Sequence, residues 1–159
     1  MISIRPATVD DVSLLRTMIW ELADYEREPD SVKITESQLA HDGFAAEPKF
    51  QALIAEWERQ PAGYAVYFDY YSTWRGRQLF LEDLFVRPQF RGKKLGMALL
   101  TEVARIAESR DCRGMRWEVL AWNQPAIELY ESLGAELLSD WKLVMLEKKG
   151  QEALGSRAV

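Results

Sequence analysis

The pattern of hydrophobic and polar positions predicts short strands that alternate with amphipathic helices. The first helix is the clearest, because apolar residues recur at helical spacing from Val12 to Leu22 after a capping-box pair formed by Thr8 and Asp11. The expected strands are Ser3–Pro6, Phe50–Glu58, Gly63–Tyr71, Leu79–Val86, Met115–Ala121 and Trp141–Glu147. The expected helices are Val12–Leu22, Glu36–Asp42, Leu95–Arg110 and Asn123–Leu133.

Turn and cap residues mark the expected boundaries. Thr35 caps the second helix, and Asp42-Gly43 should end it. The segment Gln60–Gly63 reads as the turn of an antiparallel hairpin, and Gly134 should close the last helix. The residues from Lys149 onward are polar and typical of a mobile tail. We therefore expect one α/β domain over residues 1–148 and a polar tail over residues 149–159.

Two carboxylates interrupt the apolar run Leu79–Val86, which is otherwise typical of a strand buried on both faces. Buried carboxylates are costly unless they have partners or a function. Because consecutive strand residues point to opposite faces, Glu82 and Asp83 cannot both face one cleft from a regular strand. We therefore expect a local irregularity, such as a β-bulge, at this point.

A basic loop follows this run and leads into the helix that starts near Leu95. A helix N-terminus offers unpaired N–H groups and a positive dipole end, so it suits an anion, phosphate above all. Gly92 and Gly96 would let the backbone approach such an anion closely. The alternative is a glycine-capped helix start with solvated cations around it. The loop cations are Arg87, Arg91, Lys93 and Lys94.

Composition narrows the class of protein. The chain has 159 residues, of which 48% are hydrophobic, and this length and apolar content suit one globular domain. The net charge of −5 argues against nucleic acid as a partner and is compatible with a cationic small substrate. Cys112 is the only cysteine and reads as structural, while His41 reads as a surface residue, so no metal is expected. The start of the chain lacks a signal-peptide layout and no apolar run could span a bilayer, so we expect a cytoplasmic protein with no membrane partner.

Two motifs in order carry a family resemblance. Arg91–Gly96, RGKKLG, resembles the R-x-x-G-x-G/A acyl-CoA signature of the GCN5-related N-acetyltransferases, and Trp122–Glu136, WNQPAIELYESLGAE, resembles the motif that follows it. The resemblance runs to about Glu147 and implies a GNAT-like α/β domain with a mixed, mostly antiparallel central sheet flanked by helices. Further segments resemble the diamine acetyltransferases of the spermidine/spermine or thialysine type: Ile4–Thr8, Glu21–Glu26, Asp42–Phe44, Phe80–Val86 and Ala121–Asn123.

This resemblance implies an enzyme that uses acetyl-CoA as co-substrate. The acetyl group would move to a primary amine of a small cationic substrate by direct attack in a ternary complex, without a covalent enzyme intermediate. Polyamine, ornithine-like and thialysine-like amines would all suit an acidic, aromatic pocket, so the substrate stays open. The resemblance also implies a homodimer, with Trp141 as a possible contact.

Site residues follow from the resemblance, position by position. Tyr130 matches the tyrosine that protonates the leaving thiolate, and Glu82 matches the glutamate that takes the amine proton through water. From helical spacing alone, Tyr130 would read rather as a core aromatic, and the acidic residues near the end of the first helix would read as solvated. The implied substrate contacts are Tyr25, Glu26, Trp74, Glu82 and Asp83. The implied coenzyme contacts are Leu84, Phe85, Val86, Arg91, Gly92, Lys93, Lys94, Leu95, Gly96, Met97, Asn123, Gln124, Pro125, Ala126 and Tyr130.

The sequence departs from the family pattern at three places. Lys94 stands where the family has its middle glycine, so we expect the loop to present the Lys94 N–H without a strained φ. Ser72 replaces an acidic residue that polyamine enzymes place near the distal amine, and the segment between Ala135 and Trp141 is short; both weaken a polyamine assignment. Two rival functions are a non-catalytic acyl-CoA-binding module and a protein or peptide acetyltransferase.

Overall fold

A five-stranded sheet forms the centre of the first part of the chain, in the order β1-β2-β3-β4-β5. The computed structural model describes residues 1–157, and its contacts divide the chain into a unit Met1–Leu120 and a unit that starts at Ala121. The elements of the first unit are β1 (Ile2–Pro6), η1 (Val9–Asp11), α1 (Val12–Tyr25), η2 (Pro29–Ser31), α2 (Glu36–Phe44), β2 (Gln51–Trp57), β3 (Gln60–Ser72), β4 (Gly76–Val86), η3 (Pro88–Phe90), α3 (Leu95–Ser109) and β5 (Met115–Trp117). The second unit contains α4 (Gln124–Ser132) and α5 (Lys148–Gly155).

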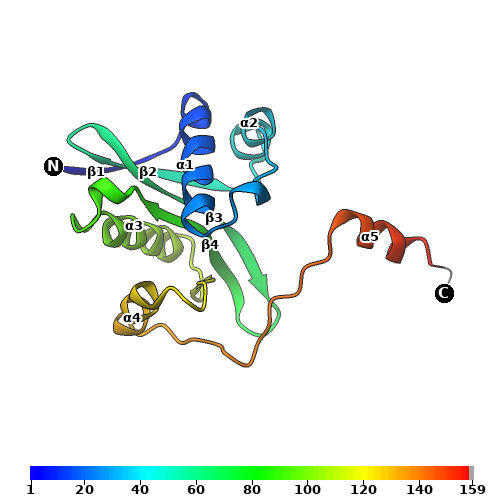
Figure 1. Cartoon of the computed structure of the whole chain (residues 1–159). Coiled ribbons are helices and arrows are strands. Elements are labelled where there is room, and N and C mark those ends of the chain that lie inside the picture. Colours follow the sequence, from blue (N-terminus) through cyan, green and yellow to red (C-terminus); the bar gives the residue numbers. More distant parts are fainter. Residues whose placement is uncertain (158–159) are drawn as a thin grey trace. The chain divides into compact units, whose positions relative to one another are not determined.

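Strands β1 to β4 pair antiparallel with their neighbours, and β5 joins β4 in parallel. Helices α1 and α2 lie on one side of this sheet and α3 lies on the other (Figure 1). A strand can run parallel to its neighbour only after a crossover, which α3 supplies between β4 and β5. The predicted α/β fold with a mixed, mostly antiparallel sheet is therefore confirmed.

The core lies between the sheet and its helices. On one face, Leu15 and Met18 of α1 pack with Ile54, Tyr64 and Phe85 of the sheet. On the other face, α3 buries the apolar stripe that its helical spacing predicts. The buried residues of α3 are Leu95, Leu99, Leu100, Val103 and Ala107.

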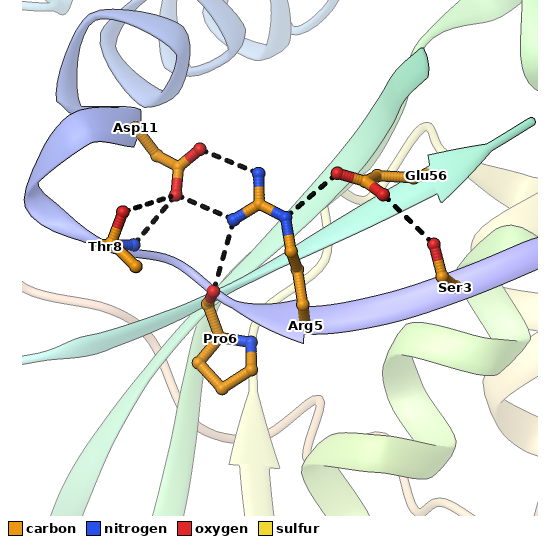
Figure 2. Close-up of polar contacts among 6 residues, drawn as sticks. All are labelled: Ser3, Arg5, Pro6, Thr8, Asp11 and Glu56. Atoms are coloured by element: carbon orange, nitrogen blue, oxygen red, sulfur yellow. Dashed lines mark hydrogen bonds and ion pairs between the residues drawn. The ribbon is translucent and has the colours of Figure 1, made fainter. Parts of the chain in front are cut away.

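A charged network ties the first strand to the first helix (Figure 2). The Arg5 guanidinium donates two hydrogen bonds of 2.8 Å to the Asp11 carboxylate and a third of 2.9 Å to Glu56 on β2. The Asp11 carboxylate also accepts the backbone N–H of Thr8 at 2.8 Å, which confirms the predicted capping pair. One guanidinium thus joins the edge strand, its neighbour and the start of α1.

The hairpin of β2 and β3 turns earlier than the sequence suggests. Trp57 pairs with Gln60, so only Glu58 and Arg59 form the turn, and both have positive φ angles of 51° and 65°. Two residues with positive φ match the right-handed twist of hairpin strands. The prediction of a turn at Gln60–Gly63 was wrong, because Pro61 and Gly63 lie inside β3.

Four other boundaries differ from the prediction. Helix α2 continues to Phe44, beyond Asp42-Gly43, because Phe44 packs against the core and against the Phe50 ring at 6.5 Å. Strand β5 ends at Trp117. Residues 141–147 form no strand in the described chain, since a strand needs a paired neighbour. Residues 148–155 form α5 where a tail was expected; residues 158–159 of that tail lie outside the described residues.

None of the helices within residues 1–157 combines the length and apolar character needed to cross a membrane.

Candidate active site

The edge of β4 is open over its last residues. Strand β5 pairs with β4 only from Leu79 to Leu81, whereas β3 pairs with β4 as far as Val86. Beyond Leu81, β4 therefore has a strand partner on one side only among the described residues. A half-open strand edge can pair with an extended ligand that carries amide groups. The predicted coenzyme residues Leu84, Phe85 and Val86 lie on this edge.

A bulge lies where this open edge begins. Val66 of β3 pairs with Asp83, and the next residue, Tyr67, pairs with Leu81, so Glu82 is the extra residue of β4. Such a bulge leaves one residue unpaired and turns its side chain away from the regular alternation. The irregularity predicted at Glu82 and Asp83 is confirmed.

The bulge sends the two carboxylates into different surroundings. Glu82 is exposed, whereas Asp83 is half-buried and accepts a hydrogen bond of 2.9 Å from the hydroxyl of Tyr64. Glu26, the first residue after α1, is close enough for its charge to act on both Asp83 and Tyr64. The structure thus brings three of the predicted substrate residues together, Glu26, Glu82 and Asp83.

Each of these carboxyls holds its proton more tightly than usual. Burial, together with the charges of Glu82 and Glu26, raises the pKa of Asp83 to about 6, although the Tyr64 hydrogen bond acts in the opposite direction. Partial desolvation by the surrounding protein raises the pKa of the Glu82 carboxyl as well, although part of its surface is exposed, and the charge of Glu118 adds to this effect. Burial raises the pKa of Glu26 as well. Carboxyls with raised pKa values can accept and return protons near neutral pH.

The start of α3 offers unpaired N–H groups. The Ala98 N–H donates to the Lys94 carbonyl at 3.0 Å, which is the first bond of the helix. The preceding N–H groups of Leu95, Gly96 and Met97 accordingly lack an intrahelical acceptor. Lys94 occupies the N-cap position and supplies no side-chain cap. This helix start can take an anion on its backbone.

Lys94 adopts the left-handed backbone conformation, with φ 62° and ψ 14°. The prediction of an unstrained φ at this position was wrong. Gly92 has a similar φ of 78°, so the loop bends twice in a way that favours glycine. The loop keeps the shape that a glycine at residue 94 would give it, and Lys94 bears the strain.

The loop cations have aromatic or acidic neighbours. The Arg91 guanidinium lies 4.5 Å from the centroid of the Tyr25 ring, and Lys93 Nζ lies 4.3 Å from that of Trp57. Arg87 donates hydrogen bonds of 2.7 and 2.9 Å to the Glu21 carboxylate. Glu21 thus neutralises the charge of Arg87, and a role of Arg87 in the anion site stays a prediction.

Trp74 lies apart from this cluster. It is 84% exposed at the tip of the β3–β4 hairpin, two residues before β4 begins at Gly76. Glu82 lies six residues beyond Gly76 on β4, about 20 Å from Gly76 at the usual rise per strand residue. The structure does not bring Trp74 to the carboxylates of the same unit.

The remaining predicted residues lie in the second unit, around α4. Asn123 occupies the N-cap position of α4 without a side-chain cap bond, and Pro125 lies in the first turn. Gly134, with φ 83°, ends the helix as predicted, and the Ala135 N–H donates to the Tyr130 carbonyl at 3.0 Å. The contact of this unit with coenzyme stays a prediction for Asn123, Gln124, Pro125, Ala126 and Tyr130.

Sequence reasoning missed Tyr64, whose position in an apolar strand gives no sign of a polar role. It also missed the partners of the loop, Glu21 and Tyr25, because pairings over more than sixty residues leave no local pattern. Within the described residues, no group of three or more His, Cys, Asp or Glu side chains could hold a metal ion.

Comparisons with known proteins show which family the chain resembles. Residues 15–135 match the Acetyltransferase (GNAT) family. The chain is 38% identical to a thialysine N-epsilon-acetyltransferase of Sus scrofa, over 97% of each chain. It is 34% identical to the spermidine/spermine N(1)-acetyltransferase-like protein 1 of Homo sapiens, over 92% of this chain and 22% of that protein.

Solved structures support the fold. An integron cassette protein from the mobile metagenome of V. cholerae superposes with a TM-score of 0.80, at 24% identity and over 98% of each chain. The family match spans most of this chain, and the pig relative overlaps nearly all of it. The chain therefore belongs to the Acetyltransferase (GNAT) family and is an acetyltransferase.

Proposed function

We propose that this acetyltransferase moves the acetyl group of acetyl-CoA to a primary amine of a small cationic substrate, by direct attack in a ternary complex. The observation that carries the proposal is the open edge of β4 beside the uncapped start of α3. The strand edge suits the amide-bearing arm of the coenzyme, and the helix start suits its diphosphate.

The binding roles divide along this line. The backbone of Leu84–Val86 would pair with the pantetheine arm. The N–H groups of Leu95–Met97 and the cations of the loop would hold the diphosphate, with Gly92 leaving room for it. Asn123–Ala126 would add a further contact. Because a substrate supplies the thioester, the residues of the chain have only to bind, orient and move protons.

The amine must lose a proton before it attacks. An alkyl ammonium with a pKa near 10.4 is neutral in only about one molecule in 2,500 at pH 7. Glu82 is the proposed proton acceptor, through a water molecule, and its raised pKa makes it a stronger base than an ordinary glutamate. The amine nitrogen then bonds to the carbonyl carbon, and the carbon–sulfur bond breaks.

Tyr130 is the proposed proton donor to the departing thiolate. Burial raises the pKa of the Tyr130 phenol, so the group keeps its proton at neutral pH until the thiolate forms. An ordinary thiol has a pKa near 8.5, below that of a phenol, so the phenol would first donate a hydrogen bond to the developing thiolate and pass its proton over as the carbon–sulfur bond breaks. The role comes from the family motif.

The substrate we propose is a short amine with one further charged end, of the thialysine type, rather than a polyamine. Glu26, Glu82 and Asp83 provide a compact acidic patch for one ammonium group. Ser72, which replaces an acidic residue of the polyamine enzymes, accepts the N–H groups of Trp74 and Arg75 at 3.3 and 3.2 Å and so serves the hairpin turn. The pig and human relatives bear names of both types.

A screen for coenzyme release tests the proposal. Thiol release from acetyl-CoA would be followed with thialysine, lysine, ornithine, diamines, polyamines and short peptides. Faster turnover on thialysine-type amines than on polyamines is expected. Turnover on peptides alone would favour a protein acetyltransferase, and tight acetyl-CoA binding without any turnover would favour a binding module.

The predicted homodimer and the cytoplasmic location are part of the same proposal. Sedimentation equilibrium of the full chain would measure the first, and a monomer at micromolar concentration would contradict it.

A further inference from the structure

The hydroxyl of Tyr64 is a polar group in an apolar place. Tyr64 lies on β3 with 0% of its surface exposed, and its ring packs in the core with Leu15, Met18 and Ile54. The ring centroid lies 6.2 Å from that of Phe85. A phenylalanine would fill this space equally well, so packing does not account for the hydroxyl.

The hydroxyl has one partner, the Asp83 carboxylate. Tyr64 donates to Asp83 Oδ2 at 2.9 Å. Asp83 Oδ1 has no hydrogen bond among the described residues, and no fully buried side-chain oxygen in that part of the chain lacks a partner, so Oδ1 keeps some exposure to solvent. The hydroxyl of a core residue thus holds one oxygen of Asp83, and the other oxygen has no hydrogen-bond partner among the described residues.

The charges around Asp83 are of one sign. Glu82, its neighbour on β4, and Glu26, at the end of α1, both act on it, whereas Tyr64 on β3 is neutral. No cation of the described residues pairs with Asp83. A carboxylate held in place among other carboxylates has its natural partner in an external cation.

We propose, on the basis of the function proposed above, that Tyr64 is a positioning residue for the amine substrate. Its hydroxyl fixes the Asp83 carboxylate so that Oδ1 accepts a hydrogen bond from the substrate ammonium group beside the Glu82 bulge. Tyr64 acts through Asp83 and touches neither substrate nor coenzyme.

The hydrogen bond also favours the ionised form of Asp83. A donor to a carboxylate stabilises its charge, whereas burial and the charges of Glu82 and Glu26 oppose it. Removing the hydroxyl should therefore raise the pKa of Asp83 further above 6, its approximate value in the intact protein. Asp83 would then take up a proton, and lose its hold on the ammonium, at a higher pH.

The test compares Tyr64→Phe with Tyr67→Phe. Tyr67 is a buried tyrosine of the same strand and does not contribute to the electrostatic surroundings of Asp83, so its variant controls for loss of a core hydroxyl. Tyr64→Phe should raise KM for the amine about 3- to 10-fold, the usual effect of one hydrogen bond, with kcat and the coenzyme Kd within about twofold. The acid limb of kcat/KM should move up by about 0.5–1 pH unit. Tyr67→Phe should leave the KM for the amine and the position of the acid limb unchanged.

A double variant separates positioning from a structural effect. With Asp83→Asn already present, Tyr64→Phe should leave KM and the pH profile unchanged, because Tyr64 acts only through that carboxylate. Unchanged KM and acid limb in Tyr64→Phe alone, or an equal rise of KM in the Asp83→Asn background, would overturn the proposal. The wild-type protein is assayed first, before any variant is made. If it acetylates no amine, the proposed function is overturned as well.

Discussion

The guanidinium of Arg91 lies over the ring of Tyr25, 4.5 Å from its centroid, and so joins the β4–α3 loop to the last residue of α1. Four residues earlier on each segment, Arg87 donates two hydrogen bonds to Glu21. The end of α1 is thus fastened to the loop at two points. Glu26 follows directly on α1. The end of α1 therefore positions both the loop proposed to bind coenzyme and a carboxylate proposed to bind the amine.

Replacing Tyr25 by Leu should weaken coenzyme binding. The ring holds Arg91 by a cation–π contact at an exposed site, typically worth about 0.5–1 kcal/mol. The Kd for CoA, measured by isothermal titration calorimetry, should rise about two- to fivefold. Tyr25→Phe keeps the ring and should bind as the wild type does. Equal affinity in Tyr25→Leu would show that the contact does not order the loop.

Replacing Lys94 by Val should destabilise the protein and weaken coenzyme binding together. A β-branched residue at φ 62° is strained by about 1–2 kcal/mol, and relief of that strain would move the N–H groups at the start of α3. Lys94→Gly should bind coenzyme at least as tightly as a variant that merely removes charge, such as Lys94→Gln. Thermal unfolding and CoA titration measure both effects. Lys93→Val is the control, because Lys93 has no positive φ. Equal unfolding temperatures for Lys94→Val and Lys93→Val would contradict the strain.

Much of the fold was predictable from local patterns. The capping pair of Thr8 and Asp11 and the apolar spacing of α1 and α3 are signals that lie within one turn or two, and the structure has these helices where they were expected. The bulge at Glu82 was also predictable, because two carboxylates in one apolar strand conflict with its alternation. These features depend on neighbours in sequence.

The features that sequence reasoning missed depend on distant neighbours. The left-handed Lys94 is imposed by the loop that surrounds it, against the preference of its own side chain. Strand β5 stops at Trp117, which pairs with Leu81 directly before the bulge of β4 at Glu82, a residue more than thirty positions earlier. The bonds of Tyr64 to Asp83 and of Arg87 to Glu21 likewise join separate elements. Such pairings are set by topology, which local pattern does not encode.

Replacing Tyr130 by Phe should lower kcat and leave coenzyme affinity within about twofold. The proposed acid would lose only its hydroxyl, so the thiolate would depart without a proton, and general acids typically contribute about 10²–10⁴ in rate. Steady-state kinetics of thiol release with a thialysine-type amine give kcat, and titration with CoA gives the Kd for the coenzyme. An unchanged kcat would remove Tyr130 as the acid.

Replacing Glu118 by Gln should shift the titration of Glu82. The Glu118 charge raises the pKa of Glu82, so its loss should lower that pKa. The acid limb of kcat/KM should then move to lower pH, while Glu82→Gln should remove the contribution of Glu82 to that limb. Glu102→Gln, on the surface of α3 beside Arg105, is a matched control that should leave the profile in place. If neither Glu118→Gln nor Glu82→Gln changes the acid limb, Asp83 alone accounts for it and Glu82 is excluded as the base.

Replacing Asp83 by Asn should make the protein more stable at pH 8. The pKa of Asp83 is raised from 3.8 to about 6, so the folded protein binds this proton more tightly than the unfolded chain does. The stability linked to that proton is present below pH 4 and is lost as pH rises through 6. Asp83→Asn should therefore raise the free energy of unfolding at pH 8 by about 1–2 kcal/mol, after allowance for solvent screening, and change it little at pH 4.

Asp11 provides a control of opposite sign. Its hydrogen bonds with Arg5 hold the pKa of the Asp11 carboxyl at about 2, below its ordinary 3.8, so its stability is present above pH 4 and is lost as pH falls through 2. Asp11→Asn should accordingly lower the free energy of unfolding at pH 8 by about 2 kcal/mol, as followed by urea unfolding across the pH range. If Asp83→Asn also proved less stable at pH 8, the Asp83 carboxylate would be a structural group like that of Asp11. A gain in stability together with a loss of amine affinity would show instead that this protein keeps a costly carboxylate for its substrate.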